Sequence, residues 1–410
     1  MLSVIGSLFG SAAKLSGFSA PSDDDLIDRV NHGVSVFILT LFAVVVSTKQ
    51  FAGDPIKCLM GKEYEGSHVD YTHHLCWIGN TYYVPFGEIL PEEEKEREMK
   101  QVKYYQWIPV ILLTQALLFK IPNVIWKLFN PRVGLNMNKI LDMVADTQLS
   151  SPDERKSTIH NLARNINNWL SFKRERYYSV ISRMRIKLSR FKILCFPLGV
   201  RSGTYLVGLY IFIKICYLAN SVGQFYLLNS FLSMDFTTYG RELVSGFTQD
   251  GMIQESYRFP KITYCDVKIR QLQNLHTKTF QCVLSINLFT EKIFAFLWFW
   301  LVAVCVLNVY SLLVWLYDVM LLRNRVLYVE EFLWSRVSVP ENRVRVSKFV
   351  DDYLRDDGVF VLRVVLENSN VMVQSDLILE LWNLFIEGPF SEMTERDKRK
   401  EQLYQEKIKG

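Results

Sequence analysis

Four long stretches of this 410-residue chain are almost free of charged residues. A helix needs about 20 mostly apolar residues to cross a hydrocarbon core of roughly 30 Å. All four stretches are long enough, and only Lys120 and Lys214 interrupt their apolar pattern. The pattern predicts four transmembrane helices, over residues 30–48, 104–126, 204–228 and 293–317.

The remaining composition fits a membrane protein better than a soluble one. Charged residues make up 22% of the chain, yet they gather in the segments between the apolar stretches. The net charge of +5 is too small to indicate nucleic-acid binding. Residues 1–13 lack the basic start of a signal peptide, so we expect no cleaved leader. The sequence therefore predicts an all-α polytopic membrane protein.

Basic residues set the expected orientation, because Lys and Arg near span ends favour the cytoplasmic side. From Lys127 to Arg201 there are fifteen basic and five acidic residues, whereas Lys49 to Lys103 holds seven basic and ten acidic ones. The middle connection is therefore expected in the cytoplasm, together with both termini. The expected cytoplasmic segments are 1–29, 127–203 and 318–410, and the expected extracellular segments are 49–103 and 229–292.

The cysteines agree with this orientation. Cys58 and Cys76 fall in the first outward segment and Cys265 and Cys282 in the second, whereas Cys195 lies alone in the basic connection. Disulfides form in oxidising compartments, so paired cysteines are expected outside the cell. Four cysteines allow three pairings, and their spacing does not choose among them.

The segments between the spans also have a predicted structure. Residues 80–84 and 259–267 are rich in β-formers and predict short strands in the outward segments. Residues 138–191 have a helical pattern, and the apolar runs at 359–366 and 377–385 would be wasted in a disordered tail. We therefore expect a folded, largely helical cytoplasmic layer.

Several motifs together resemble those of the innexins, the gap-junction proteins of invertebrates. The second span opens with Y-Y-Q-W-I-P, which is similar to the Y-Y-Q-W signature of that family. Leu59 departs from it, because many members carry Trp after the first outward cysteine. The similar segments are F-A-G-D-P-I-K-C at 51–58, C-W-I-G-N-T-Y-Y-V-P at 76–85, Y-Y-Q-W-I-P at 104–109, F-P-K-I-T-Y-C-D-V-K-I-R at 259–270, Q-C-V-L-S-I-N-L-F-T-E-K-I-F-A-F-L-W-F-W at 281–300 and D-G-V-F-V-L-R at 357–363.

The resemblance implies a function. Innexin subunits form symmetric rings around a wide pore, and rings in apposed cells dock through their outward loops. Ions and small metabolites then diffuse between cytoplasms, at gap junctions of the plasma membrane. The expected partners are a ring of like subunits, the apposed ring and membrane lipids. We expect no enzyme activity, cofactor or metal site, since neither a nucleophile motif nor a phosphate loop is present.

The resemblance also implies how the outward cysteines pair. In this family pattern Cys58 would bond Cys282 and Cys76 would bond Cys265, which joins the two outward segments. The alternative is pairing within one segment, Cys58 with Cys76, and the residues alone permit it.

The Y-Y-Q-W block has two interpretations. Tyr104, Tyr105, Gln106 and Trp107 stand at a membrane boundary, where aromatic residues anchor spans. Pro109 could also bend the helix, because proline lacks the backbone donor. We favour anchoring.

The two lysines within the predicted spans have different expected roles. Lys120 lies near a span end, so its side chain is expected to snorkel to the interface. Lys214 lies deeper in its span, and an intramembrane charge is a functional candidate. For Lys214, snorkelling and a functional role both stay open.

Asp23, Asp24, Asp25 and Asp28 form an acidic run directly before the first span. One interpretation is helix capping, with Ser22 as the cap and Asp25 at the third position. In the family the N-terminal segment enters the pore, so the run could also favour cations at the pore mouth. The two interpretations are compatible.

Two other functions fit part of the sequence, a hemichannel and an adhesion protein. A non-junctional hemichannel that releases ions and metabolites differs little in sequence, although no Asn-x-Ser/Thr sequon is present to block contact with another membrane. A four-span adhesion protein would be shorter and would lack the helical layer.

Overall fold

The computed structural model describes most of the chain and divides it into two compact units. The first unit contains residues 23–33, 120–218 and 307–388, and the second contains 34–119 and 219–306, within the residues described. The described residues are 23–61, 64, 66–147, 151–174, 203–232, 235–250, 258–334 and 339–388. The predicted Ser22 cap, residues 1–22 and Cys195 lie outside them.

Four helices are long and apolar enough to cross a membrane, as the sequence predicted. Every helix is longer than its predicted span, because the helical hydrogen bonding continues past the apolar stretch. The last, α12, has 36 residues, about 54 Å at 1.5 Å per residue. The spans are Leu26–Phe51 (α2 Leu26–Arg29, a π-helical turn η1 Val30–Ser35, and α3 Val36–Phe51), Tyr105–Val133 (η2 Tyr105–Trp107, α6 Ile108–Phe129, η3 Asn130–Val133), α10 Tyr205–Leu232 and α12 Ser285–Met320.

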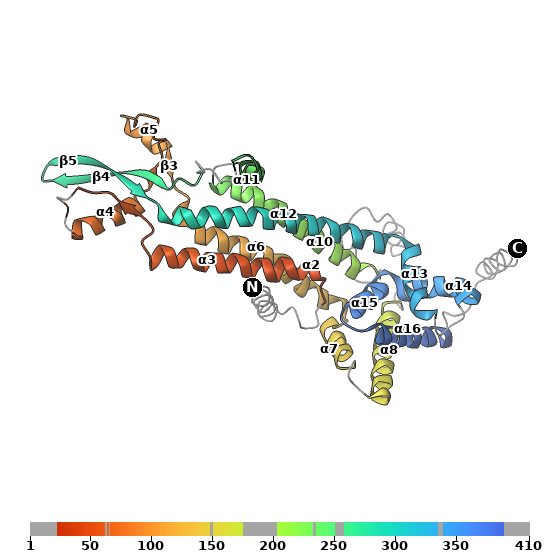
Figure 1. Ribbon diagram of the computed structural model, residues 1–410. Helices are drawn as coiled ribbons and strands as arrows, with labels where there is room; N and C mark the ends of the chain where they lie inside the picture. The colour runs from red at the N-terminus through yellow and green to blue at the C-terminus, as the bar shows by residue number, and fades with distance from the viewer. Residues whose placement is uncertain are drawn as a thin grey trace. The chain divides into compact units, whose positions relative to one another are not determined.

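Among the residues described, seven further helical segments belong to the first unit. Helix α16 packs on α8 and α13, and α15 packs on α7 and α16; Figure 1 shows α8 crossing beside α16. These segments confirm the predicted helical layer. They are α7 Met137–Thr147, α8 Pro152–Arg174, α13 Leu322–Leu333, α14 Val339–Lys348, the π-helical turn η4 Phe349–Leu354, α15 Arg355–Glu367 and α16 Val371–Glu387.

One hydrophobic core joins these helices to the ends of the spans. The Tyr210 ring of α10 lies 4.8 Å from Trp315 of α12 and 5.0 Å from Phe360 of α15, between ring centroids. Aromatic pairs at these distances add to the free energy of area burial. The D-G-V-F-V-L-R motif therefore contributes its phenylalanine to the contact between the helical layer and two spans.

The aspartate of the same motif caps the third span. Asp357 Oδ1 accepts hydrogen bonds from the backbone N–H groups of Leu206 and Val207, at 3.0 and 3.3 Å. The first N–H groups of a helix have no partner within the helix, and an N-cap oxygen satisfies them. Here the cap comes from a residue 151 positions away in the chain.

The second unit contains a five-stranded sheet with strand order β1-β5-β4-β2-β3. The predicted strand at 80–84 is present in part as β2, and the strand at 259–267 is longer than predicted and pairs with β5 as a hairpin (Figure 1). The helices of this unit outside the spans, α4, α5 and α11, were not predicted. The elements are β1 Lys57–Cys58, α4 Gly66–Ile78, β2 Thr81–Tyr82, α5 Glu94–Met99, β3 Gln101–Val102, α11 Phe236–Asp250, β4 Ile262–Gln271 and β5 Asn274–Val283.

Two disulfides join the two segments that build this sheet. Cys58 of β1 bonds Cys282 of β5, and Cys76 of α4 bonds Cys265 of β4. These are the pairs that the family resemblance implied, and pairing within one segment is excluded. Each bond closes a long loop, and a disulfide contributes roughly 2–4 kcal/mol of stability in the entropic account.

Replacing Asp357 with alanine should destabilise the protein, because two buried N–H groups of α10 would lose their acceptor. We expect a loss of about 2 kcal/mol, measured as a lower Tm of the detergent-purified protein. Asp357→Asn keeps one acceptor oxygen and should lose less. An alanine variant as stable as the wild type would mean that the cap is dispensable.

Candidate functional site

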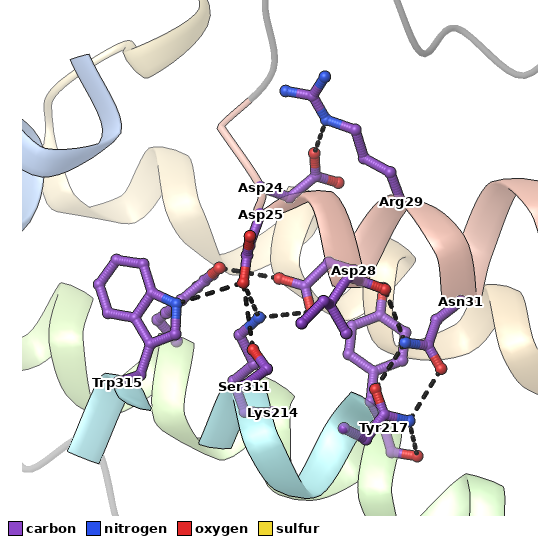
Figure 2. Close-up of polar contacts among 12 residues, drawn as sticks. Asp24, Asp25, Asp28, Arg29, Asn31, Lys214, Tyr217, Ser311 and Trp315 are labelled. Carbon is purple, nitrogen blue, oxygen red and sulfur yellow. Dashed lines mark hydrogen bonds and ion pairs between the residues drawn. The ribbon is translucent and has the colours of Figure 1, made fainter. Parts of the chain in front are cut away.

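The candidate site is a polar cluster in the first unit, where the start of the first span meets the other three spans (Figure 2). Polar side chains at this depth are costly unless they bond one another, so such a cluster marks a functional site. Its residues come from the three aspartates directly before α2 and from α2, η1, α6, η3, α10 and α12.

Lys214 of α10 lies at the centre of the cluster. Its Nζ lies 2.9 Å from Asp28 Oδ1 and 3.1 Å from Asp25 Oδ2, and its side chain is only 2% exposed. The Tyr210 hydroxyl donates to the other oxygen of Asp28 at 2.8 Å. A buried ammonium is tolerated only when it is paired and hydrogen-bonded. Of the two interpretations of Lys214, the buried ion pairs exclude snorkelling.

Asp25 connects this ion pair to the fourth span. Its Oδ2 also accepts from Ser311 Oγ at 3.1 Å and Trp315 Nε1 at 3.4 Å. Burial raises the pKa of Asp25, but Lys214 and these donors more than offset it, so the pKa lies below its ordinary value. Asp25 therefore stays ionised and holds three spans together.

Asp23 bonds the second span. Asp24 bonds both the second span and the first turns of the first span. Asp23 Oδ2 accepts from Trp126 Nε1 at 2.9 Å and from Asn130 Nδ2 at 2.5 Å. Burial and the neighbouring charge of Asp24 raise the pKa of Asp23. The carboxylate of Asp24 is surrounded by Arg29 Nε at 3.4 Å, His32 Nε2 at 2.6 Å and Asn123 Nδ2 at 3.3 Å.

A pair of asparagines links the first and fourth spans. Asn31 Nδ2 donates to Asn308 Oδ1 at 2.7 Å, and Asn308 Nδ2 donates back to Asn31 Oδ1 at 3.0 Å. Asn31 lies in the π-helical turn η1, and such turns are frequent at functional sites. Each amide therefore donates to the other and accepts from it, and Asn31 Nδ2 also donates to the Ile27 carbonyl at 2.8 Å.

The capping interpretation of the acidic run needs correction. Asp25 is itself the N-cap residue of α2 rather than its third position, and its side chain makes no capping hydrogen bond. The carboxylates of Asp23, Asp24 and Asp28 are at least 95% buried against other protein groups. Their carboxylates accept hydrogen bonds or form ion pairs within the subunit. This geometry therefore gives no support to a role as exposed charge at a pore mouth.

Lys120, the other lysine within a span, lies at the surface of the first unit. Its side chain is exposed, and its Nζ lies 3.5 Å from the His32 carbonyl oxygen at the edge of the cluster. This position is consistent with a side chain that reaches towards the interface.

A cavity of about 260 Å³ lies beside the cluster, and Asp25, Ser311, Asp318, Arg363 and Glu367 line part of it. Arg363 pairs with Asp318 at 2.5 Å. Partial desolvation at the cavity, followed by the negative charge of Asp25, raises the pKa of Glu367 to about 7, although the residue as a whole is exposed at the protein surface. Sequence reasoning missed Glu367, because its unusual environment comes from residues that are far away in the chain.

The Y-Y-Q-W block lies in the second unit and does more than anchor a span. Trp107 is 60% exposed, as expected for an interfacial aromatic. Tyr105 is fully buried, and both its hydroxyl and Gln106 Nε2 donate to the Trp77 carbonyl at the end of α4, at 3.3 and 2.5 Å. The block therefore ties a disulfide-bonded helix to the second span.

Tyr104 and Pro109 complete the block. The Tyr104 hydroxyl donates to the Arg258 carbonyl at 3.3 Å. Pro109 occupies the first turn of α6, where a missing N–H costs nothing because that group has no helical partner. The proline inside the helix is Pro122, so a bend at Pro109 is not supported.

Comparison with known proteins gives consistent results. The Innexin family model matches residues 24–385. The chain is 34% identical to Innexin unc-9 of Caenorhabditis elegans, over 94% of this chain and 97% of that protein. It is 31% identical to Innexin-19 of Caenorhabditis briggsae, over 94% and 92%.

Glu367 should make stability depend on pH. Its folded pKa of about 7 lies above the ordinary value of 4.5, so the unfolded chain releases this proton first. Stability should therefore fall as pH rises from about 4.5 to 7. Glu367→Gln should flatten this part of the pH profile of Tm and be the more stable protein at pH 8. Parallel profiles would show that the pKa of Glu367 in the folded protein is not raised above its ordinary value.

Proposed function

Because the chain belongs to the innexin family, we propose that it is a subunit of a gap-junction channel that passes ions and small metabolites between adjacent cells. Innexins form gap-junction channels and hemichannels, and members assemble into oligomeric channels. In this proposal like subunits form a ring around a wide pore, and a ring in the neighbouring cell docks on it.

The observation that carries the junctional part of the proposal is the cross-linked sheet of the second unit. Segments 49–103 and 229–292 both contribute strands to one sheet, and two disulfides join the two segments. A docking surface binds more tightly when it is ordered before contact, because ordering it on contact costs free energy.

The proposed topology places the second unit's segments 49–103 and 229–292 outside the cell. The disulfides support this side, because the cytoplasm keeps thiols reduced. The excess of basic residues in 127–203 supports a cytoplasmic location for that segment, for 318–410 and for both termini. Residues 1–29 would then begin at the cytoplasmic side of the pore.

The aspartate cluster supports a specific role for that N-terminal segment. Asp23, Asp25 and Asp28 bond three different spans. The chain that precedes Asp23 is therefore attached to a fixed point on the subunit. We propose that these aspartates influence permeation by positioning the N-terminal segment and not as exposed charges.

Paired cells that express the protein test the proposal. Wild-type pairs should show junctional conductance, and Cys76→Ser should lose it, because the docking sheet loses a cross-link. Cys305→Ser is the matched control, since Cys305 forms no disulfide and should conduct normally. Surface biotinylation shows whether the variants reach the membrane. A wild type that conducts in single cells but never between cells would be a hemichannel.

A further inference from the structure

A groove of about 400 Å³ lies between the first and fourth spans, within the second unit. Helices α3 and α12 (Figure 1) are in contact next to it, where the rings of Phe42 and Phe296 meet edge to face at 5.6 Å between centroids. Of the described residues that line the groove, only Lys292 is charged. The other walls are apolar: Leu41, Phe42 and Val45 of α3 and Leu288, Phe289 and Ile293 of α12.

The groove opens on the surface that these two spans present to their surroundings. Leu41 and Val45 are 47% and 43% exposed, and Leu288 and Phe289 are 50% and 46% exposed. Both helices are long and apolar enough to cross a membrane, so hydrocarbon and not water is the medium around them. The occupant of the groove is therefore apolar, either a lipid chain or a span of another copy of the chain.

Lys292 gives this apolar groove a cation at its rim. Its side chain is 58% exposed, and its Nζ lies 3.9 Å from Glu291 Oε1, which is too long for a hydrogen bond. Glu291 Oε2 lies closer to another ammonium, that of Lys261, at 3.6 Å. Lys292 directly precedes the predicted span 293–317, and a lysine at a span boundary extends its stem along apolar surface and holds its ammonium among the headgroups. Lys292 is thus placed to meet an anion from outside the subunit.

We propose that this groove binds a phospholipid, with one acyl chain along the apolar walls and the phosphate at Lys292. A phospholipid supplies an anion where the hydrocarbon ends, whereas the spans of a second copy do not, because no Asp or Glu occurs in residues 30–48, 104–126, 204–228 or 293–317. A neighbouring span would fill the groove but would leave the ammonium without an opposite charge. The proposed topology, on which this last assignment rests, places the lipid in the outer leaflet.

Photolabelling tests the acyl-chain part of the site. The full chain is reconstituted in phosphatidylcholine vesicles that contain a phosphatidylcholine with a diazirine on one acyl chain, and labelled peptides are mapped by mass spectrometry. Leu41→Trp should lower the label on residues 288–293 by roughly fivefold or more, because the indole occupies the space of the chain. Leu113→Trp is the matched control, since Leu113 of α6 is also 47% exposed and lies outside the groove. Equal labelling of 288–293 in the two variants, or no label there in the wild type, would overturn the proposal.

A second lipid tests the role of the phosphate. Diacylglycerol with the same diazirine chain lacks the phosphate, so it should label residues 288–293 of the wild type less than phosphatidylcholine does. Lys292→Gln should lower phosphatidylcholine labelling to the diacylglycerol level, whereas Lys292→Arg keeps the charge and should retain the difference. Equal labelling of the wild type by both lipids would contradict phosphate binding. Tm and non-reducing gels show that each variant is folded. The assay needs no junctional conductance, so a failure of the proposed channel function would leave its outcome unchanged.

Discussion

The buried ammonium of Lys214 is the interaction on which the first unit depends. A charge at this depth in a span is stable only with opposite charge at bonding distance, and Asp25 and Asp28 provide it. The same aspartates bond Tyr210, Ser311 and Trp315. The start of the first span is therefore fixed against the third and fourth spans. In a channel whose N-terminal segment enters the pore, this fixed point would determine where that segment begins.

The sheet of the second unit depends on covalent bonds as well. Its strands β1 and β2 have two residues each, too few to hold a sheet by hydrogen bonds alone. The two disulfides and the hydrogen bonds of Tyr105 and Gln106 to the Trp77 carbonyl supply the missing constraint. A rigid sheet allows a docking surface to be presented without further ordering. Both units thus fix a segment that the proposed channel uses, one at the pore entrance and one at the docking surface.

Sequence reasoning predicted what depends on local pattern. The spans, the helices over 359–366 and 377–385 and the family signature are visible in short windows, and the resemblance implied the disulfide pairs. It failed where a partner is distant: Asp28 and Lys214 are 186 residues apart, and Asp357 caps a helix 151 residues away. In the sequence, an acidic run before a helix resembles a capping motif. Only the fold shows that two of its carboxylates pair with Lys214. The sequence did not predict the turn between β4 and β5, because its exposed residues carry no periodic pattern.

The most direct test of the role of Lys214 is a double-mutant cycle between Lys214→Met and Asp28→Asn, measured as Tm of the purified protein. Removing the lysine alone leaves the buried carboxylate of Asp28 and the partly buried carboxylate of Asp25 without their cation and should cost about 3–5 kcal/mol. In the Lys214→Met background, Asp28→Asn should cost far less than in the wild type, or should stabilise the protein. A coupling free energy of about 1–3 kcal/mol would support the account. Additive effects would contradict it.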